Sequence, residues 1–530
     1  MDINITLKNY RCFTTEAPAA LSLSAGFTGF VGVNNAGKSV LLRSFYELRA
    51  IYEALAANTD TFRSILRGDN VPLDPKAADP EEIFNNENSA DIELEICIPV
   101  AANSETQVNR ATIVVDRKQF HWTARFSTAS VALPPGLLKA GYRLESFLVR
   151  SSASGVVADF RHLFGACSSL KDAYYIPSFR HLTPFSPTAG SIGRGSTYFD
   201  INVGKPFIEL WHTLQTGTLG RDRQRISRLV KEIQQVFGFK DLQVNASLGN
   251  DTLIFTIDGK TLKLEELGGG VAQFVVVLGN VALRNPTYIC IDEPELNLHP
   301  SLQVRFLTKL AAYARDGVLF ATHSLGLARS VADRVFSVHR RNGRAEVSAF
   351  TGTPRLAELV GELNYEGYRD LGFNKVLLVE GRTDVKTFIE FLRVLGKENE
   401  FLVVPVSDCI NGNSHDELQE LTRIAPSVHA VIDSERAAAA DPLQKRRQDF
   451  CRVCEKLDIS CHVLERRATD NYLSEAAVRL EFGDSHTAMS HFQTRTAGQS
   501  WSKTDNWKVA RHMTREELLA TDLGQFLSSI

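Results

Sequence analysis

Two adjacent carboxylates, Asp292 and Glu293, follow the apolar segment Tyr288-Ile289-Cys290-Ile291 and precede Pro294. This segment is too short for an isolated helix and predicts a strand buried on both faces. Because proline cannot continue a central strand, the carboxylates should lie at its carboxyl end, where open α/β sheets bind ligands. One acid could hold Mg²⁺ on a nucleotide, and the other could polarise a water for attack on the γ-phosphate. A solvated acidic turn is the alternative.

A glycine-rich loop upstream has the spacing of a phosphate site. The segment Gly32-Val33-Asn34-Asn35-Ala36-Gly37-Lys38-Ser39 is a complete G-x4-G-K-S, preceded by a predicted strand and followed by a predicted apolar helix over about 41–55. Its glycines let backbone N–H groups approach a phosphate, and the helix N-terminus adds a favourable dipole. Lys38 can reach the β- and γ-phosphates, and Ser39 can ligate Mg²⁺. The predicted nucleotide-binding residues are Gly32, Asn34, Asn35, Ala36, Gly37, Lys38 and Ser39.

Two further segments could complete a nucleotide site. Gly268, Gly269 and Gly270 begin an apolar helix, whose N-terminus could bind an anion or could serve only as a hinge. The predicted strand over 318–321 delivers His323 to the same sheet edge as the Asp292 carboxylate. We therefore expect His323 to contact the γ-phosphate.

A second group of acids lies in the last third of the chain. Glu380 and Asp384 follow a predicted strand over 375–379, and Asp433-Ser434-Glu435 follows another over 429–432. Parallel strands would bring these carboxylates to one sheet edge, where they would repel unless they share divalent cations. Paired metal ions suit in-line phosphodiester cleavage. Separate solvated strand-end acids are the alternative.

The remaining sequence sets bounds on the architecture. The 530 residues should form two to four domains, and the net charge of −3 confines any nucleic-acid surface to local patches. No apolar run approaches the roughly 20 residues of a membrane span, the N-terminus is no signal peptide, and the eight cysteines are scattered. We therefore expect a cytoplasmic protein that does not enter the membrane. Cys451, Cys454 and Cys461 are expected to be core residues rather than zinc ligands.

Residues 57–240 are the least regular part. The sequence predicts a surface loop over about 57–90, an inserted antiparallel sheet over about 91–126, and helices over about 205–238. The apolar stripe of these helices favours a core position over a dimerisation surface. Its residues are Ile226, Leu229, Ile233 and Phe237.

The order of motifs in the first 365 residues resembles that of ABC-type ATPases of the SMC and RecF kind. The shared motifs are the P-loop, a late glycine-rich signature, Ile-Asp-Glu-Pro-Glu, the D-loop-like Leu296-Asn297-Leu298-His299-Pro300 and Ala-Thr-His-Ser. The resemblance implies Asp292 on Mg²⁺, Glu293 as the catalytic acid that orients water, and His323 as the switch histidine. It also implies that Gly268 and Gly269 contact ATP held by the P-loop of a second copy.

Residues 366–530 resemble a Toprim domain, a Rossmann-like metal-dependent module. The shared residues are Glu380-Gly381 at a strand end and Asp433-Ser434-Glu435, in which Glu435 replaces the second Asp of the family's Asp-x-Asp. Arg466-Arg467-Ala-Thr-Asp470-Asn-Tyr-Leu resembles a segment of one Toprim branch, with Asp470 in place of Glu. The resemblance implies Glu380 as metal ligand or general base, and Asp384, Asp433, Glu435 and Asp470 as metal ligands. Lys508 is the implied electrostatic stabiliser, with Lys503 as the second choice.

An ABC-type ATPase followed by a Toprim domain resembles the OLD (overcoming lysogenization defect) nucleases, including those of Gabija systems and some retrons. The resemblance implies an ATP- and Mg²⁺-dependent DNA endonuclease, with Mn²⁺ as an alternative at the Toprim site. It further implies a homodimer or higher oligomer, a role in antiphage defence, and a helicase-like protein, a reverse transcriptase or an RNA–DNA hybrid as partner. A DNA clamp without nuclease activity is the competing interpretation. Arg436, Lys445-Arg446-Arg447 and Arg466-Arg467 are candidate phosphate contacts.

Overall fold

The computed structural model describes most of the chain, in two compact units. The described residues are 2–77, 79–99, 105–151, 155–178, 199–217, 220–249, 251–341, 344–350, 375–398, 400–406, 415, 418–419, 421–422, 427–495 and 501–530. Unit 1 comprises Met1–Leu298, Lys309–His323 and Phe336–Phe350, and unit 2 comprises His299–Thr308, Ser324–Val335 and Thr351–Ile530. The predicted domain boundary near residue 365 lies outside the described residues.

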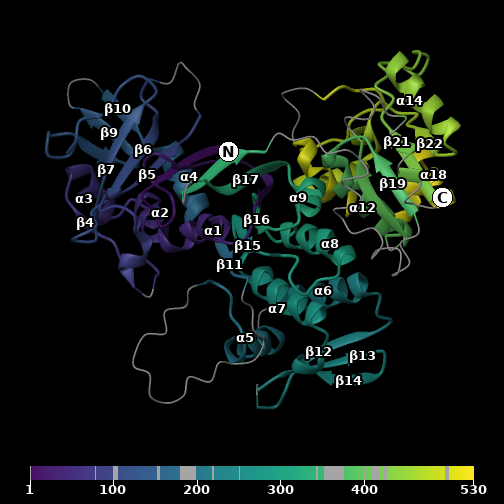
Figure 1. The fold of residues 1–530 in the computed structure, drawn as a ribbon, viewed down its shortest axis with the longest axis horizontal. Coiled ribbons are helices and arrows are strands. Elements are labelled where there is room, and N and C mark those ends of the chain that lie inside the picture. Colours follow the sequence, from purple (N-terminus) through teal and green to yellow (C-terminus); the bar gives the residue numbers. More distant parts are fainter. Residues whose placement is uncertain are drawn as a thin grey trace. The chain divides into compact units, whose positions relative to one another are not determined.

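The central sheet of unit 1 has the order β11-β15-β16-β3-β17-β18 (Figure 1). Its strands are β11 (Tyr174–Ile176), β15 (Tyr288–Asp292), β16 (Gly317–Thr322), β3 (Gly26–Val31), β17 (Arg334–Arg341) and β18 (Arg344–Ala349). The first four are parallel, and every residue of β15 and β16 is buried, as their continuous apolar sequences predict. Asp292 pairs in register with Ala321, and Thr322 with Val31, so the loops after these three strands meet at one edge.

The helix after the P-loop is shorter than its apolar periodicity predicts. It divides into α1 (Lys38–Glu47) and α2 (Arg49–Leu55), with Leu48 between them. Leu41, Phe45 and Leu55 are nevertheless buried as expected. The periodicity therefore identified the buried face but not the break.

An antiparallel sheet of six strands, in the order β2-β1-β5-β6-β7-β4, makes up another part of unit 1. The strands are β1 (Ile3–Lys8), β2 (Ala19–Leu23), β4 (Val71–Pro72), β5 (Ile92–Cys97), β6 (Val108–Val115) and β7 (His121–Thr128). The predicted sheet is therefore not only an insertion, since the N-terminal hairpin of β1 and β2 joins it through β5. A smaller sheet contains β8 (Arg143–Glu145), β9 (Leu148–Ser151) and β10 (Gly155–Asp159), and α4 (Arg161–Lys171) packs on α2.

The prediction of a surface loop over 57–90 is wrong. The segment contains α3 (Asp60–Arg67), and Phe62, Ile65 and Leu66 are buried in the core beneath the antiparallel sheet. Thr59 caps this helix and Gly68 ends it in the left-handed conformation. The many Asp, Asn and Pro residues around this helix concealed its short apolar stripe.

Three helices and a small sheet complete unit 1. They are α5 (Lys205–Thr216), α6 (Gly220–Phe237), α7 (Gly269–Arg284) and the hairpin strands β12 (Leu242–Ala246), β13 (Leu253–Ile257) and β14 (Lys260–Lys263). Helix α6 lies beside α7 (Figure 1), and Ile226, Leu229 and Ile233 are buried, which supports a core position for this stripe.

Unit 2 contains a parallel sheet in the order β20-β19-β21-β22. The strands are β19 (Lys375–Val379), β20 (Phe401–Pro405), β21 (Ser427–Ile432) and β22 (Ser460–Val463). Alternate residues of β19 pack into two separate cores, one with α14 (Lys445–Lys456) and the other with α12 (Arg382–Leu395). These two helices therefore cover opposite faces of the sheet, as a Rossmann-like fold requires.

Short elements surround this sheet. Shorter helices follow β22: α15 (Glu475–Phe482), α16 (Asn506–Ala510), α17 (Arg515–Leu519) and α18 (Asp522–Ser529). Helix α9 (Leu325–Val331) also belongs to unit 2 and packs on α12, where buried Lys386 pairs with Asp333 at 3.1 Å. Helix α8 (Pro300–Ala311) begins in unit 2 and ends in unit 1. Among the described residues, no helix combines the length and apolar character needed to cross a membrane.

Candidate phosphate and metal sites

The P-loop of unit 1 is held closely against the central sheet. A Cβ on Gly32 would lie 2.0 Å from the carbonyl oxygen of Val338 on β17, so only glycine fits there. Asn35 and Gly37 adopt positive φ angles of 60° and 115°, which curve the backbone into the start of α1. The Lys38 ammonium donates to the carbonyl oxygens of Gly32 and Val33 at 2.8 and 3.0 Å. Burial lowers the pKa of Lys38, and the neighbouring Asp292, Glu293 and Glu295 oppose this shift.

The ends of β15 and β16 bring the predicted catalytic groups together. Nε2 of His323 lies 3.0 Å from Oε1 of Glu293, and both imidazole nitrogens lie 3.4 Å from Nζ of Lys38. Asp292 is buried at the end of β15. Glu293 has a positive φ of 46°, a strained conformation that turns its side chain out of the strand. Lysine, acid and histidine thus converge at one edge.

Glu295 is a site residue that the sequence did not single out. Its Oε1 accepts hydrogen bonds from the Thr322 hydroxyl at 2.5 Å and the His323 backbone N–H at 2.9 Å. These bonds fix the turn that carries His323. Glu295 is the last residue of the Ile-Asp-Glu-Pro-Glu motif, and membership of that motif was its signal in the sequence.

The glycine-rich signature forms the exposed N-terminus of α7. Gly268 is the N-cap, and Gly269 lies against Asn297 of the D-loop-like segment, where a Cβ would lie 3.5 Å from that of Asn297. Gln273 in the second turn donates to the Pro294 carbonyl at 3.4 Å. This N-terminus is open to solvent, as a site for a nucleotide on a second copy would need to be.

Unit 2 gathers three of the predicted metal ligands. Glu380, Asp433 and Glu435 each offer a carboxylate oxygen, and these oxygens lie within 4.8 Å of one another. The parallel pairing of β19 and β21 explains the convergence, since Val379 pairs with Val431 and both strands end at the same edge. Glu435 has a positive φ of 55°, which turns it back toward the cluster. Burial, then the charge of Asp384, raises the pKa of Asp433 to about 8.

Two arginines neutralise the outer carboxylates. Buried Arg447 on α14 binds Glu380 with both terminal nitrogens, at 2.7 and 2.8 Å, and also donates to the Asp433 carbonyl at 2.6 Å. Burial opposes ionisation of Glu380, but this guanidinium lowers its pKa below the usual value. Arg467 pairs with Glu435 at 2.6 Å. Both arginines thus face the protein's own acids, and their contact with DNA phosphates stays a prediction.

The other predicted ligands lie beside the cluster with partners of their own. Asp384 is buried, accepts from the Gly381 N–H at 3.0 Å, and lies 3.4 Å from the ammonium of Lys503. Asp470 pairs with Arg495 at 3.0 Å and accepts from Asn506. Neither belongs to the trio of converging oxygens. Asp384 and Asp470 contribute negative charge around this trio.

Lys503, rather than Lys508, is the lysine beside the acids. Asp384 raises the pKa of Lys503, with smaller contributions from Asp433, Asp470 and Glu380. Lys508 instead pairs with Asp505 one helical turn before it, at 2.9 Å. The lysine named second from the sequence is therefore the one near the acidic cluster, and which of the two serves the site stays a prediction.

The donor sets fit the groups that the sequence implies. A trio of carboxylate oxygens, one of them on a buried acid whose pKa is raised, is the chemistry that hard divalent cations such as Mg²⁺ or Mn²⁺ require. In unit 1, a nucleotide phosphate with its Mg²⁺ fits the P-loop at Gly32 together with the side chains of Lys38, Ser39 and Asp292.

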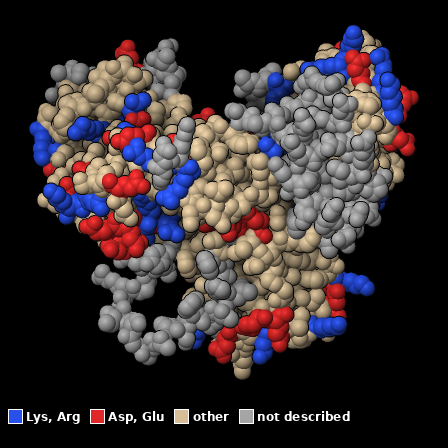
Figure 2. Space-filling model, viewed as in Figure 1, with Lys and Arg blue, Asp and Glu red and all other residues tan. Residues whose placement is uncertain are grey.

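Figure 2 shows basic and acidic side chains interspersed over the antiparallel-sheet part of unit 1. Exposed Arg110 pairs with half-buried Glu95, and exposed Lys139 with half-buried Asp69. The described residues of this sheet region therefore present mixed charge on that face, in keeping with the net charge of −3.

Fold and sites together define a P-loop α/β unit joined in one chain to a parallel α/β unit with an acidic cluster. No protein-family model matches the chain. Over 73 residues it is 36% identical to peptide import ATP-binding proteins of Brucella abortus strains 2308 and 9-941, a match that covers 13% of this chain. The chain spans about a fifth (21%) of the length of these relatives.

Structural neighbours are SMC head domains. One is from Thermotoga maritima (12% identity, TM-score 0.31, 66% of this chain and 98% of that chain). Another is an SMC head bound to the C-winged helix domain of ScpA (12% identity, TM-score 0.37, 66% of this chain and 97% of that chain). A third has an extended coiled coil and is bound to the C-terminal domain of ScpA from Pyrococcus furiosus (10% identity, TM-score 0.36, 69% of this chain and 99% of that chain). These values assign no function. The named proteins include no Toprim or OLD-family member, so that resemblance stays a prediction.

Proposed function

We propose that this chain is an ATP-hydrolysing, metal-dependent DNA endonuclease that nicks or cuts both strands, with its ATPase unit controlling the nuclease unit. The observation that carries the proposal is the convergence of Glu380, Asp433 and Glu435 at one sheet edge, with oxygens within 4.8 Å. Lys503 beside Asp384 adds the positive charge that a scissile phosphate needs. The P-loop site of unit 1, in the same chain, would control the nuclease unit through ATP.

In the nuclease unit, bound Mg²⁺ would activate a water and stabilise charge on the scissile phosphate. The protein's own residues position the carboxylates that would hold the metal ion. The strand ends fix Glu380 and Asp433, and the Thr469 backbone N–H donates to Asp433 at 3.0 Å, which orients that carboxylate. Arg447 keeps Glu380 ionised and therefore able to bind a cation or accept a proton.

In the ATPase unit, Lys38 would bind the β- and γ-phosphates and Asp292 and Ser39 would hold Mg²⁺. Glu293 would accept a proton from the attacking water, while His323, 3.0 Å away, would hold Glu293 and contact the γ-phosphate. Gly268 and Gly269 would contact nucleotide on a second copy, which makes a homodimer the proposed working form. A role in antiphage defence, with a helicase-like protein, a reverse transcriptase or an RNA–DNA hybrid as partner, rests on the family resemblance.

Plasmid nicking tests the nuclease directly. Supercoiled DNA incubated with the full chain and Mg²⁺ or Mn²⁺, across an ATP titration, should be converted to open-circular or linear forms. Glu380→Ala should abolish this conversion and leave ATP hydrolysis largely intact. Glu82→Ala, an exposed acid of unit 1, is the matched control and should cleave normally. Cleavage retained by Glu380→Ala would place the metal site elsewhere.

An ATP-driven DNA clamp without nuclease activity is the second candidate. The salt bridges of Glu380 with Arg447 and of Glu435 with Arg467 favour it, because arginines can replace metal ions as the counter-charge of an acidic cluster. DNA binding by the wild-type chain with no cleavage at any ATP concentration, in Mg²⁺ and in Mn²⁺, would select the clamp.

A further inference from the structure

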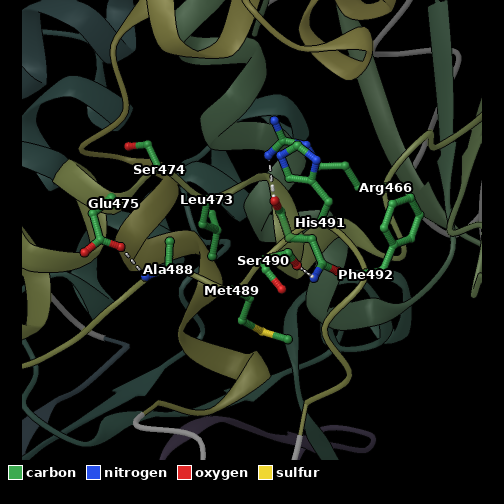
Figure 3. Close-up of a pocket in the computed structure, with 10 residues that line it drawn as sticks. Arg466, Leu473, Ser474, Glu475, Ala488, Met489, Ser490, His491 and Phe492 are labelled. Carbon is green, nitrogen blue, oxygen red and sulfur yellow. Dashed lines mark hydrogen bonds between the residues drawn. The ribbon is translucent and has the colours of Figure 1, made fainter. Parts of the chain in front are cut away.

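A pocket in unit 2 lies next to the acidic cluster along the chain but is not part of it. It has a volume of about 700 Å³, within the range of roughly 300–1,000 Å³ that small-molecule sites occupy. It is lined by Arg466, Asn471, Leu473, Ser474, Glu475, Ala488, Met489, Ser490, His491 and Phe492 (Figure 3). All of these residues follow β22, within the described range 427–495.

The lining combines flat rings, an apolar wall and hydrogen-bonding groups. Figure 3 shows Arg466, His491 and Phe492 on one side of the pocket and Ser474, Glu475 and Ala488 on the other. Buried Leu473 and Met489 supply apolar surface, whereas the His491 ring is exposed. A planar heterocycle with polar edges matches such a lining, since it can stack on a ring and form hydrogen bonds at its rim.

The charges of the lining point to a neutral group rather than to a phosphate. Arg466 is engaged with the Asn471 carbonyl at 2.7 Å and lies 4.8 Å from the centre of the Tyr472 ring. Glu475 faces the pocket from the other side, where it accepts from the Ala488 N–H at 2.6 Å and pairs with Arg479. The Glu475 carboxylate would repel a negatively charged phosphate, whereas it would not repel a neutral nucleobase.

Hydrogen bonds connect the pocket wall to the acidic cluster. The Ser434 hydroxyl, between Asp433 and Glu435 in sequence, donates to the Arg466 carbonyl at 2.7 Å. The Glu435 N–H donates to the Arg467 carbonyl, and the Arg467 N–H donates to the His491 carbonyl, both at 2.9 Å. The segment that carries two metal-ligand candidates is thus bonded directly to Arg466 and Arg467, and Arg467 is in turn bonded to the His491 side of the pocket.

We propose that this pocket binds an unstacked nucleobase of the DNA strand whose phosphate lies at the Glu380–Asp433–Glu435 cluster. This inference rests on the proposed nuclease function and adds a substrate subsite to it. The site would favour single-stranded or locally melted DNA, because a base must leave the duplex to enter. His491 stacks on the base, while Ser490 and Arg466 lie at its polar edge.

Binding of a fluorescein-labelled single-stranded 20-mer to the full chain, measured by anisotropy with Ca²⁺ in place of Mg²⁺, tests the pocket without cleavage. Loss of one stacking ring typically weakens binding about tenfold or more, so we expect His491→Ala to raise the Kd by about that factor. Ser490→Trp, which fills the pocket, should weaken binding at least as much. His486→Ala removes a histidine of the same segment outside the pocket and should bind within about twofold of wild type. Thermal unfolding should be unchanged in all three variants.

The outcomes separate this inference from the nuclease itself. Normal oligonucleotide binding by both His491→Ala and Ser490→Trp would overturn the pocket assignment, whether or not wild type cleaves DNA. Free thymidine or adenosine monophosphate that competes as well as the oligonucleotide would assign the pocket to a free nucleotide instead. Pocket variants that weaken binding while wild type nicks no plasmid would support the base site and reject the nuclease.

Discussion

Replacing Arg447 by Met should destabilise unit 2 and make its stability depend on divalent cations. The Arg447 side chain is 1% exposed and forms three hydrogen bonds, two to the Glu380 carboxylate and one to the Asp433 carbonyl. Removing one partner of a buried ion pair typically costs about 3–5 kcal/mol, because the remaining charge stays buried. Since the Glu380 side chain is 24% exposed, some of its charge can be solvated, and we expect about 3 kcal/mol.

Thermal unfolding of the full chain by calorimetry, in EDTA and in Mg²⁺, measures this loss. For a domain of roughly 150–250 residues, 3 kcal/mol corresponds to a fall of about 6–12 °C in the Tm. In Mg²⁺ the difference from wild type should narrow, because a cation on Glu380 and Asp433 supplies the positive charge that Arg447 provided. The preceding residue provides the control, since Arg446 is exposed and Arg446→Met should shift the Tm by no more than about 1–2 °C.

Two results would refute this reasoning. Equal Tm values for the Arg447→Met and Arg446→Met variants would mean that the ion pair with Glu380 contributes nothing to stability. A Tm difference that Mg²⁺ leaves unchanged would mean that no cation takes the place of Arg447 at Glu380 and Asp433.

Three other predictions follow from the same geometry. Glu293→Gln should retain ATP binding, measured with a fluorescent ATP analogue, and lower hydrolysis about 10²-fold or more; wild-type turnover would remove Glu293 from its role. Lys503→Met should abolish plasmid nicking while Lys508→Met retains it, and the reverse result would restore the choice made from sequence. Burial opposes ionisation of Asp522, but hydrogen bonds from His462, Glu465 and Tyr472 lower its pKa to about 2. A carboxyl group with a lowered pKa stabilises the fold at pH values above the pKa of an Asp in the unfolded chain, which is near 4. Asp522→Asn should therefore lower the free energy of unfolding by about 2 kcal/mol at pH 7, and by progressively less as the pH falls toward 2. Chemical denaturation at pH 7 and pH 3 checks this against Asp484→Asn, an exposed acid whose loss should have little effect at either pH.

Strong local patterns made most of the strands and the motif-bearing helices predictable. The continuous apolar runs of β15, β16 and β19 indicated strands with two buried faces, because such sequences suit only the interior of a parallel sheet. Helix α12 ends at Gly396 with φ of 75°, the left-handed conformation in which a glycine commonly terminates a helix. Where apolar residues were sparse among polar ones, as in α3, the local signal was too weak.

The sequence by itself determined which side chains reach the two sheet edges, because strand ends and glycine loops fix where Lys38, Asp292, Glu380 and Asp433 lie. Only the tertiary structure decided what surrounds them. Glu295, Arg447 and Lys503 come from elements distant in sequence or from turns without a periodic pattern, and their charges find partners only after the sheets form. The pairing of buried charges depends on three-dimensional distance, and spacing along the chain does not encode that distance.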